Sequence, residues 1–285
     1  MNQIGCFCVS SRAACYGVEE DMISVISIIN NEKIAKDFLL QGLSHQNTKY
    51  ELILIENKNN LSYKSASQAL NCGGNRAKGD FLMFIHQDVM LFSHSWLKDA
   101  ENSLSTVSNL GIAGVVGMLK PHYMNDFEMY VRCALLTTLK LSAWVSHYGR
   151  GNLCCGYEKK PWWGKQISGI LSVQTLNEML LIVPAQVFEN TKFDETTCDD
   201  WHLYGVDYSL TASKAGLQTC ILPYPVIHWD GGARGLSKPY YKTLGKLLKK
   251  HKNEETINTT CGLWFTRPQI SELQMRRPRS LVFRG

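Results

Sequence analysis

Short apolar runs alternate with amphipathic segments along the first half of the chain. The runs rich in β-branched residues predict strands at 23–29, 50–55 and 81–85. Segments 32–43 and 64–77 lie between them and have helical character, and Asn30-Asn31 supplies good capping residues for the first. Strands separated by helices at this spacing favour right-handed crossovers. The pattern therefore predicts an α/β fold with a mostly parallel central sheet flanked by helices.

The third apolar run ends in the polar triplet His86-Gln87-Asp88. In an open α/β sheet, ligands bind at the carboxyl ends of the strands. Because side chains alternate along a strand, His86 and Asp88 are expected on one side and Gln87 on the other. An imidazole and a carboxylate on one side suit a divalent cation. The alternative is a strand that simply ends in polar residues at the surface.

The second half of the chain is less regular. Apolar segments at 112–117, 179–183 and 219–222 predict further strands, and 208–215 predicts a helix closed by Gly216. Residues 118–175 lack this alternation and are rich in Tyr, Trp, His and Gly. Aromatic rings on loops stack on sugars or bases, so this insertion is expected to lie on the side of the domain where an acceptor substrate is recognised. An aromatic-rich insertion that packs its own small core is the alternative.

The two ends of the chain differ in character. Residues 1–21 show no periodic pattern and are interpreted as an N-terminal extension or an added edge element before a domain at 22–232. Residues 233–285 are expected to form a C-terminal basic helix, at 239–252, and a basic tail. A solvated helix packed on the domain is the default interpretation, and peripheral contact with the inner face of a membrane is the alternative.

Composition narrows the class of protein. The 285 residues contain no apolar run long enough for a membrane span, and the N-terminus lacks a signal-peptide pattern, so a cytoplasmic location is expected. The ten cysteines include no Cys-x-x-Cys pair, which favours free thiols over a zinc site. A net charge of +5 fits an anionic ligand or a membrane surface better than nucleic acid. The turn at Asn30-Asn31 has no glycine, and a Walker-type loop is absent, which excludes both common phosphate loops.

Several motifs, in their order along the chain, carry a family resemblance. They are Ile23 to Asn31, Ile55-Glu56-Asn57, Asn71 with Lys78-Gly79-Asp80, His86-Gln87-Asp88-Val89, Val173 to Glu178, Phe193-Asp194-Glu195, Trp201 to Asp207 and Val226-Ile227-His228. Together they resemble family 2 glycosyltransferases of the GT-A (Rossmann-like) fold, in a branch with His-Gln-Asp in place of Asp-x-Asp. The resemblance covers 22–232. It implies a nucleotide-diphosphate sugar as donor, Mn²⁺ or Mg²⁺ as cofactor, and an inverting transfer.

The resemblance also assigns residues to the donor site. It makes Asp88 the best metal ligand by position, His228 a second ligand, and His86 either a weak ligand or a donor to the diphosphate. It places Glu56 where the family has an acid that contacts the base or ribose. Asn30 and Asn71 would be neighbours in that pocket.

The catalytic base is less clearly marked, because the sequence departs from the family pattern. Gly205 stands where family members commonly carry the base, and Asn177 stands where an acid is often found. The remaining carboxylate candidates are, in order of preference, Asp207, Asp200 and Glu178. The expected acceptor is a glycan or a lipid-linked sugar, as in polysaccharide biosynthesis. The two departures leave a second hypothesis, a catalytically idle GT-A module that binds glycan or a partner transferase.

Overall fold

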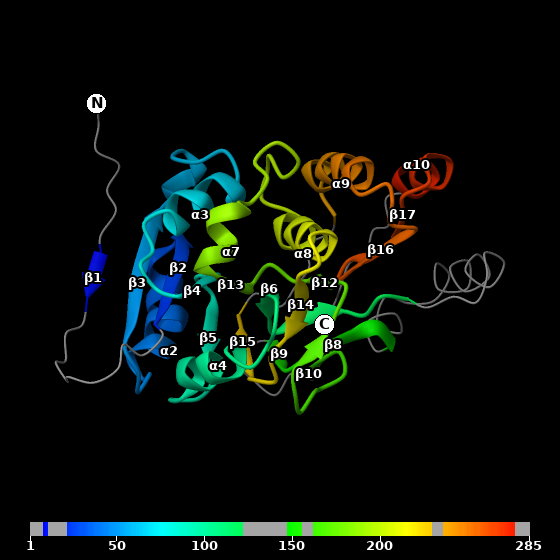
Figure 1. The fold of residues 1–285 in the computed structure, drawn as a ribbon. Coiled ribbons are helices and arrows are strands. Elements are labelled where there is room, and N and C mark those ends of the chain that lie inside the picture. Colours follow the sequence, from blue (N-terminus) through cyan, green and yellow to red (C-terminus); the bar gives the residue numbers. More distant parts are fainter. Residues whose placement is uncertain (1–7, 11–21, 122–146, 156–161, 230–235, 277–285) are drawn as a thin grey trace.

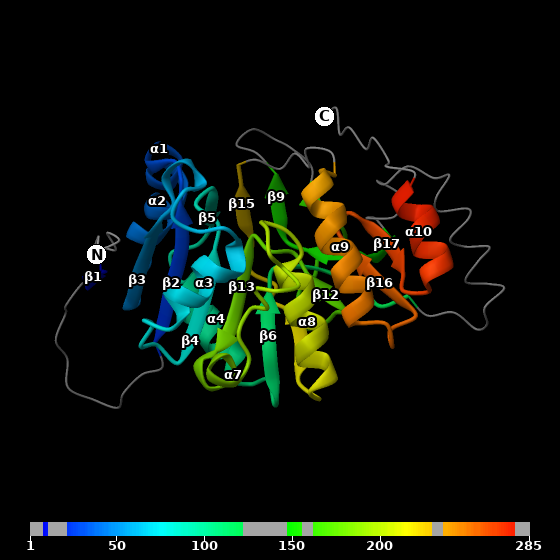
Figure 2. The same cartoon turned by 90° about the horizontal axis from the view of Figure 1, so that it is seen from above.

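A large mixed sheet forms the centre of the computed structural model, which describes residues 8–10, 22–121, 147–155, 162–229 and 236–276. Its strands are β1 (Cys8–Ser10), β2 (Ile23–Ile29), β3 (Tyr50–Glu56), β4 (Phe81–Ile85), β6 (Leu110–Gly114), β11 (Leu171–Ser172), β13 (Leu180–Pro184) and β14 (Gln218–Ile221). Their order across the sheet is β1-β3-β2-β4-β13-β6-β14-β11. In Figure 2 the strands β3, β2, β4, β13 and β6 of this order can be followed from left to right.

The prediction of a mostly parallel sheet is confirmed. Strands β3, β2, β4, β6 and β14 run in one direction, and β1, β13 and β11 run in the other. Strand β13 is inserted antiparallel between β4 and β6, so the 179–183 segment runs against its neighbours. Its residues 180–183 are fully buried on both faces, which explains a continuous apolar run without alternation.

Helices cover both faces of the sheet. The predicted 32–43 helix consists of α1 (Glu32–Ala35), a π-helical turn η1 (Lys36–Leu40) and α2 (Gln41–Ser44), and Asn31 caps it by accepting from the Ile34 amide at 3.1 Å. A single 3₁₀ turn, η2 (Lys58–Asn60), precedes α3 (Ala66–Gly74). The other helices over the sheet are α4 (Trp96–Leu104), α7 (Ala185–Asn190) and α8 (Tyr204–Lys214). Helices α3, α7 and α8 lie on one face, and α2 and α4 on the other (Figures 1 and 2).

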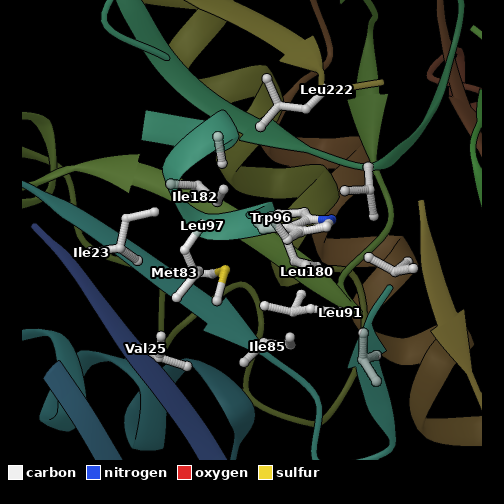
Figure 3. Packing of buried hydrophobic residues seen from close by; sticks show 14 of the residues in the cluster. Ile23, Val25, Met83, Ile85, Leu91, Trp96, Leu97, Leu180, Ile182 and Leu222 are labelled. Atoms are coloured by element: carbon white, nitrogen blue, oxygen red, sulfur yellow. The ribbon is translucent and has the colours of Figure 1, made fainter. Parts of the chain in front are cut away.

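Each face of the sheet has its own apolar core. Figure 3 shows the core under α4, where Trp96 and Leu97 pack against Met83 and Ile182. Trp96 is completely buried, and its indole Nε1 donates to the carbonyl oxygen of Pro225 at 3.2 Å. Replacing such a side chain by alanine typically costs about 3–5 kcal/mol of stability. These cores fix the strand ends on which the polar residues stand.

Two smaller sheets continue from the central one. The first has the order β10-β9-β15-β5 and contains β5 (Val89–Leu91), β9 (Leu153–Cys155), β10 (Trp162–Trp163) and β15 (Val226–His228). The second has the order β12-β7-β8, from β7 (Val116–Met118), β8 (Gly149–Gly151) and β12 (Thr175–Leu176). The described parts of the 118–175 insertion contain strands of two or three residues, separated by bends and loops. Its segments 122–146 and 156–161 lie outside the described residues.

The C-terminal region packs against α8. It contains α9 (Lys238–Lys250), β16 (Thr256–Thr259), β17 (Gly262–Phe265) and α10 (Pro268–Arg276), and the β16–β17 hairpin has no counterpart in the sequence prediction. Leu244, Leu247 and Leu248 of α9 share a core with α8 residues. Lysines of α9 pair with nearby acids: Lys242 and Lys246 contact Asp199 at 3.0 and 2.7 Å.

The default interpretation of a helix packed on the domain therefore describes α9. Among the described helices, α9 included, none has the length and apolar character needed to cross a bilayer. The tail predicted beyond residue 276 lies outside the described residues.

Candidate active site

The ends of β2 and β4 are tied together by one side chain, Gln87. Its Oε1 accepts from the backbone amides of Asn30 and Asn31 at 3.1 and 3.0 Å, and its Nε2 donates to Oδ1 of Asn30. The strand does not continue through the triplet: residues 87 and 88 form a turn, closed by the Val89 amide donating to the His86 carbonyl at 3.2 Å, and the Gln87 side chain points toward the β2 turn. The contact holds Asn30 at the carboxyl edge of the sheet.

His86, Asp88 and His228 come together at the same edge. The antiparallel pairing of β15 with β5 places His228 opposite Val89, and the Trp229 amide donates to the Asp88 carbonyl at 2.9 Å. As a result, His228 Nε2 lies 3.3 Å from Asp88 Oδ2, and His86 Nδ1 lies 4.0 Å from Asp88 Oδ1. One ligand atom from each residue lies within 4.8 Å of the other two.

The surroundings shift the charges of this cluster. Burial lowers the pKa of His86 to about 4, Asp88 opposes the shift and His228 adds to it, although 42% of the His86 side chain remains exposed. Burial raises the pKa of Asp88, but the hydrogen bond and charge of His228, followed by the charge of His86, outweigh burial and lower it overall. At neutral pH the cluster therefore offers a carboxylate and a neutral His86 ring.

Tyr204 determines which nitrogen of His86 faces the cluster. The Tyr204 hydroxyl lies 3.0 Å from His86 Nε2 and 3.4 Å from the Glu178 carbonyl oxygen. A hydroxyl that donates to the carbonyl can accept a hydrogen bond from Nε2–H, which leaves the Nδ1 lone pair directed toward Asp88. Burial raises the pKa of Tyr204 well above its ordinary value, so the hydroxyl remains protonated.

A cavity of about 250 Å³ opens beside the cluster. More than half of its wall is apolar, and the complete lining is Ile28, Asn30, Ala66, Leu70, Phe84, Ile85, His86, Gln87, Asp88, Glu178, Trp201 and Tyr204. Polar groups on one side of an otherwise apolar cavity are typical of small-molecule sites. The described part of the chain thus combines a candidate cation cluster with space for a ligand.

Glu178 is the carboxylate candidate that lines this cavity. Burial raises the pKa of Glu178 to about 7, against the effect of nearby backbone amides, chiefly that of Leu203. Its Oε1 is buried and has no hydrogen-bond partner among the described residues. Leu203, which precedes α8, has φ +65°, an uncommon conformation for a branched residue and one often found at functional sites.

Asp207, the first-ranked candidate from the sequence, lies elsewhere. It is 2% exposed and is absent from the cavity wall. Its Oδ2 accepts from Lys250 Nζ at 2.7 Å, and its Oδ1 lies 2.8 Å from His251 Nε2. Asp207 therefore joins α8 to the end of α9.

Three further sequence candidates also lie outside the cavity wall. Asn71 is held by the 193–195 loop, where its amide donates to the Phe193 carbonyl and to Glu195 Oε1, each at 2.9 Å. Asp200 accepts from the Trp201 amide at 2.7 Å, beside the cavity. Glu56 ends β3 in register with Ile29, one residue before Asn30.

The sequence analysis assigned no role to Gln87, Trp201 or Tyr204. All three lie within the quoted motifs, so their position was visible but their contacts were not. Tyr204 meets His86 across 118 residues of sequence, and Gln87 meets Asn30 across 57. Contacts between residues this far apart in the sequence leave no local pattern in it.

The donor set fits a divalent cation. A carboxylate and two imidazoles supply one oxygen and two nitrogens, which Mn²⁺ accepts, and solvent or ligand oxygens could complete the shell. The Tyr204–His86 contact also provides the partner that ligating histidines usually have on their second nitrogen.

Comparison with known proteins agrees with the fold. A family model described as glycosyltransferase like family matches residues 24–251. Similar solved structures include GalNAc-T7 with UDP, GalNAc and Mn²⁺ (TM-score 0.51, 12% identity, covering 82% of this chain and 48% of that one). Staphylococcus aureus TarS 1–349 in complex with UDP-GlcNAc is another (TM-score 0.50, 11% identity, 81% and 66%). The mannosyltransferase PcManGT from Pyrobaculum calidifontis, in complex with GDP-Man and Mn²⁺, is a third (TM-score 0.47, 13% identity, 83% and 66%).

These likenesses concern the fold alone, and this chain spans between 48% and 66% of the length of the three solved proteins. No curated protein matches the sequence.

Proposed function

The chain belongs to the glycosyltransferase-like family and has the GT-A fold, and from this premise we propose that it is a metal-dependent, inverting glycosyltransferase. The donor is a nucleotide-diphosphate sugar, and the acceptor is a glycan or a lipid-linked sugar. The observation that carries the proposal is the His86–Asp88–His228 cluster at the edge of a cavity. GalNAc-T7 was solved with UDP and Mn²⁺, and TarS with UDP-GlcNAc, which supports this class of donor.

Each part of the site has a role in this proposal. Asp88 and His228, with His86 through Nδ1, would hold Mn²⁺ or Mg²⁺, and a bound cation supplies Lewis-acid stabilisation of the departing diphosphate. Gln87 keeps Asn30 in the cavity wall. The apolar wall formed by Leu70, Phe84 and Trp201 offers contact area to a base or sugar.

A thermal-shift screen tests the proposal. UDP, GDP and dTDP are each added with and without Mn²⁺. At saturating concentration, one of them is expected to raise the melting temperature by roughly 5 °C in the presence of Mn²⁺. Asp88→Ala is expected to remove the metal-dependent part of the shift, whereas Asp37→Asn, at a carboxylate that pairs with Lys33 on the surface, serves as the matched control. No shift with any of the three nucleotides contradicts the proposal.

An idle GT-A module that binds glycan or a partner transferase is the second candidate, because Gly205 and Asn177 depart from the family pattern. Asn177 has structural contacts: its amide donates to Thr260 Oγ1 at 3.2 Å, and its Oδ1 accepts from the Met179 amide at 3.0 Å. Release of nucleoside diphosphate from a nucleotide sugar by the purified protein would reject an idle module. Peripheral membrane contact stays a prediction of the sequence.

A further inference from the structure

Gly205 and Glu178 face each other at the start of α8. A Cβ atom built on Gly205 would lie 3.0 Å from Glu178 Cγ and 3.2 Å from Leu181 Cδ1, closer than ordinary packing allows. Gly205 is buried in the first turn of α8. A side chain at position 205 and the Glu178 side chain therefore compete for one volume.

The backbone gives no separate reason for a glycine at this position. Gly205 is helical and is not among the described glycines with positive φ, so any L-residue could adopt its conformation. Glycine is also a poor helix former. The remaining explanation is space, and the Glu178 side chain, with Leu181 beside it, occupies that space.

The Glu178 carboxylate has the exposure to ligand that a proton acceptor needs. Glu178 is partly exposed and lines the same cavity as His86 and Asp88. A pKa of about 7, caused mainly by burial, also suits a group that gains and loses a proton near neutrality.

We infer that Glu178 is the general base of the transfer, and that its carboxylate takes the place of one carried by residue 205. Relative to the family pattern, the base thus lies in the segment just before β13 and not in the first turn of α8. The inference rests on the proposed function. It reverses the order of candidates drawn from the sequence, because both oxygens of Asp207 have partners from the C-terminal region.

The proton of the acceptor hydroxyl passes to the Glu178 carboxylate, which borders the cavity, while the acceptor oxygen forms a bond to the anomeric carbon. The bond from that carbon to the diphosphate oxygen breaks, and its electron pair leaves with the nucleoside diphosphate. The open space beside Glu178 is the cavity, so the acceptor hydroxyl must approach Glu178 from the cavity.

The first experiment measures catalysis. UDP-GlcNAc and GDP-mannose serve as donors with Mn²⁺, water and free monosaccharides serve as acceptors, and released UDP or GDP is quantified. Glu178→Gln is expected to lower kcat by about 100-fold or more, with KM for the donor changed less than about threefold. The control Glu189→Gln removes an exposed carboxylate of α7 and is expected to match wild type. A Glu178→Gln variant with kcat within about threefold of wild type overturns the inference.

The second experiment moves the carboxylate from position 178 to position 205. Glu178→Ala removes the Cγ atom that blocks residue 205, so Glu178→Ala combined with Gly205→Asp has room for the transposed carboxylate. The double variant is expected to recover at least about tenfold in kcat over Glu178→Ala alone, and Gly205→Asp alone is expected to lose activity. A double variant no more active than Glu178→Ala refutes the exchange.

A stability measurement tests the shared volume without any substrate. Gly205→Ala is expected to lower the melting temperature by roughly 3 °C in the wild-type background, because the added methyl group crowds Glu178. In the Glu178→Ala background the same change is expected to be neutral or stabilising. Equal shifts in both backgrounds contradict the space argument.

The outcomes separate the two proposals. Wild-type protein that turns over a donor while Glu178→Gln remains fully active refutes only the role of Glu178. Wild-type protein that neither binds a nucleoside diphosphate nor releases one from the donors refutes the proposed function, and the catalytic role of Glu178 falls with it.

Discussion

Two carboxylates stand on opposite sides of the first turn of α8, and their environments differ. Asp207, on the α9 side, is bound through both oxygens, by Lys250 and by His251. Glu178, on the cavity side, has one oxygen without a partner among the described residues. Asp207 is buried, whereas Glu178 is partly exposed. The difference in partners separates a carboxylate that holds elements together from one that is available to a ligand.

The largest effect on stability is expected from the α9 side. Asp207→Ala leaves Lys250 and His251 without their shared anion in a buried site, which typically costs about 3–5 kcal/mol. Urea denaturation measures the loss, and kcat per folded molecule is expected to fall far less than in Glu178→Gln. A variant of native stability with an activity loss as large as that of Glu178→Gln would reverse the assignment of the two carboxylates.

On the cavity side, removing the Glu178 carboxylate is expected to stabilise the protein and not to destabilise it. The pKa of Glu178 rises from its ordinary 4.5 to about 7 in the folded protein, so the folded state binds more protons between these values. The contribution of Glu178 to stability is then fully present below pH 4.5, declines as pH rises, and is lost above about pH 7. Glu178→Gln is expected to be more stable than wild type by up to about 3 kcal/mol at pH 8 and equal to it at pH 4.5. Urea titrations at both pH values check this, and a constant difference across pH would contradict it.

Loss of the Gln87 contact between the ends of β2 and β4 is expected to have a smaller effect, and this effect is on nucleoside-diphosphate binding. Gln87→Leu removes the acceptor for two backbone amides and the donor to Asn30. The loss of ordered polar contacts is expected to weaken nucleoside-diphosphate binding by about tenfold, or roughly 1.4 kcal/mol. Calorimetric titration with UDP or GDP in Mn²⁺ measures it. Gln186→Leu, at an exposed position of α7, is the matched control, and equal affinities in the two variants would refute a role for Gln87.

The smallest effect is expected on the outer surface of α9. Lys242 is 67% exposed, and its partner Asp199 also contacts Lys246, so Lys242→Ala is expected to cost less than about 0.5 kcal/mol. Thermal denaturation measures this change. Sedimentation with phosphatidylserine vesicles tests the membrane alternative for the same helix, and vesicle binding lost in Lys242→Ala would support that alternative over a purely structural ion pair.

Much of the fold follows from local sequence pattern. Strands β2, β3 and β4, their intervening helices and the polar end of β4 were all predictable, because each has its own apolar run or cap. The antiparallel course of β13 was not, since a strand buried on both faces looks the same in either direction. The β16–β17 hairpin was also missed. Strand β16 is largely polar in sequence but buried in the structure, where Asn258 and Thr259 find partners.

In the candidate site, too, some features could be predicted from the sequence and others could not. The structure places His86, Asp88 and His228 together, as the family resemblance implied. The relation between Glu178 and Gly205 depends on close approach across 26 intervening residues, and no spacing in the sequence records it. The partners of Asp207 lie more than 40 residues away, at Lys250 and His251, so its rank as a base could be judged only from contacts.

The contact between Asp207 and the end of α9 also sets a lower limit on a shortened chain. A truncation before Lys250 would remove both partners of the Asp207 carboxylate and leave a bare charge buried under α8. The family match itself ends at residue 251. A protease cut or a premature stop in α9 is therefore expected to unfold α8 as well, and any minimal fragment made for crystallisation or directed evolution should retain His251.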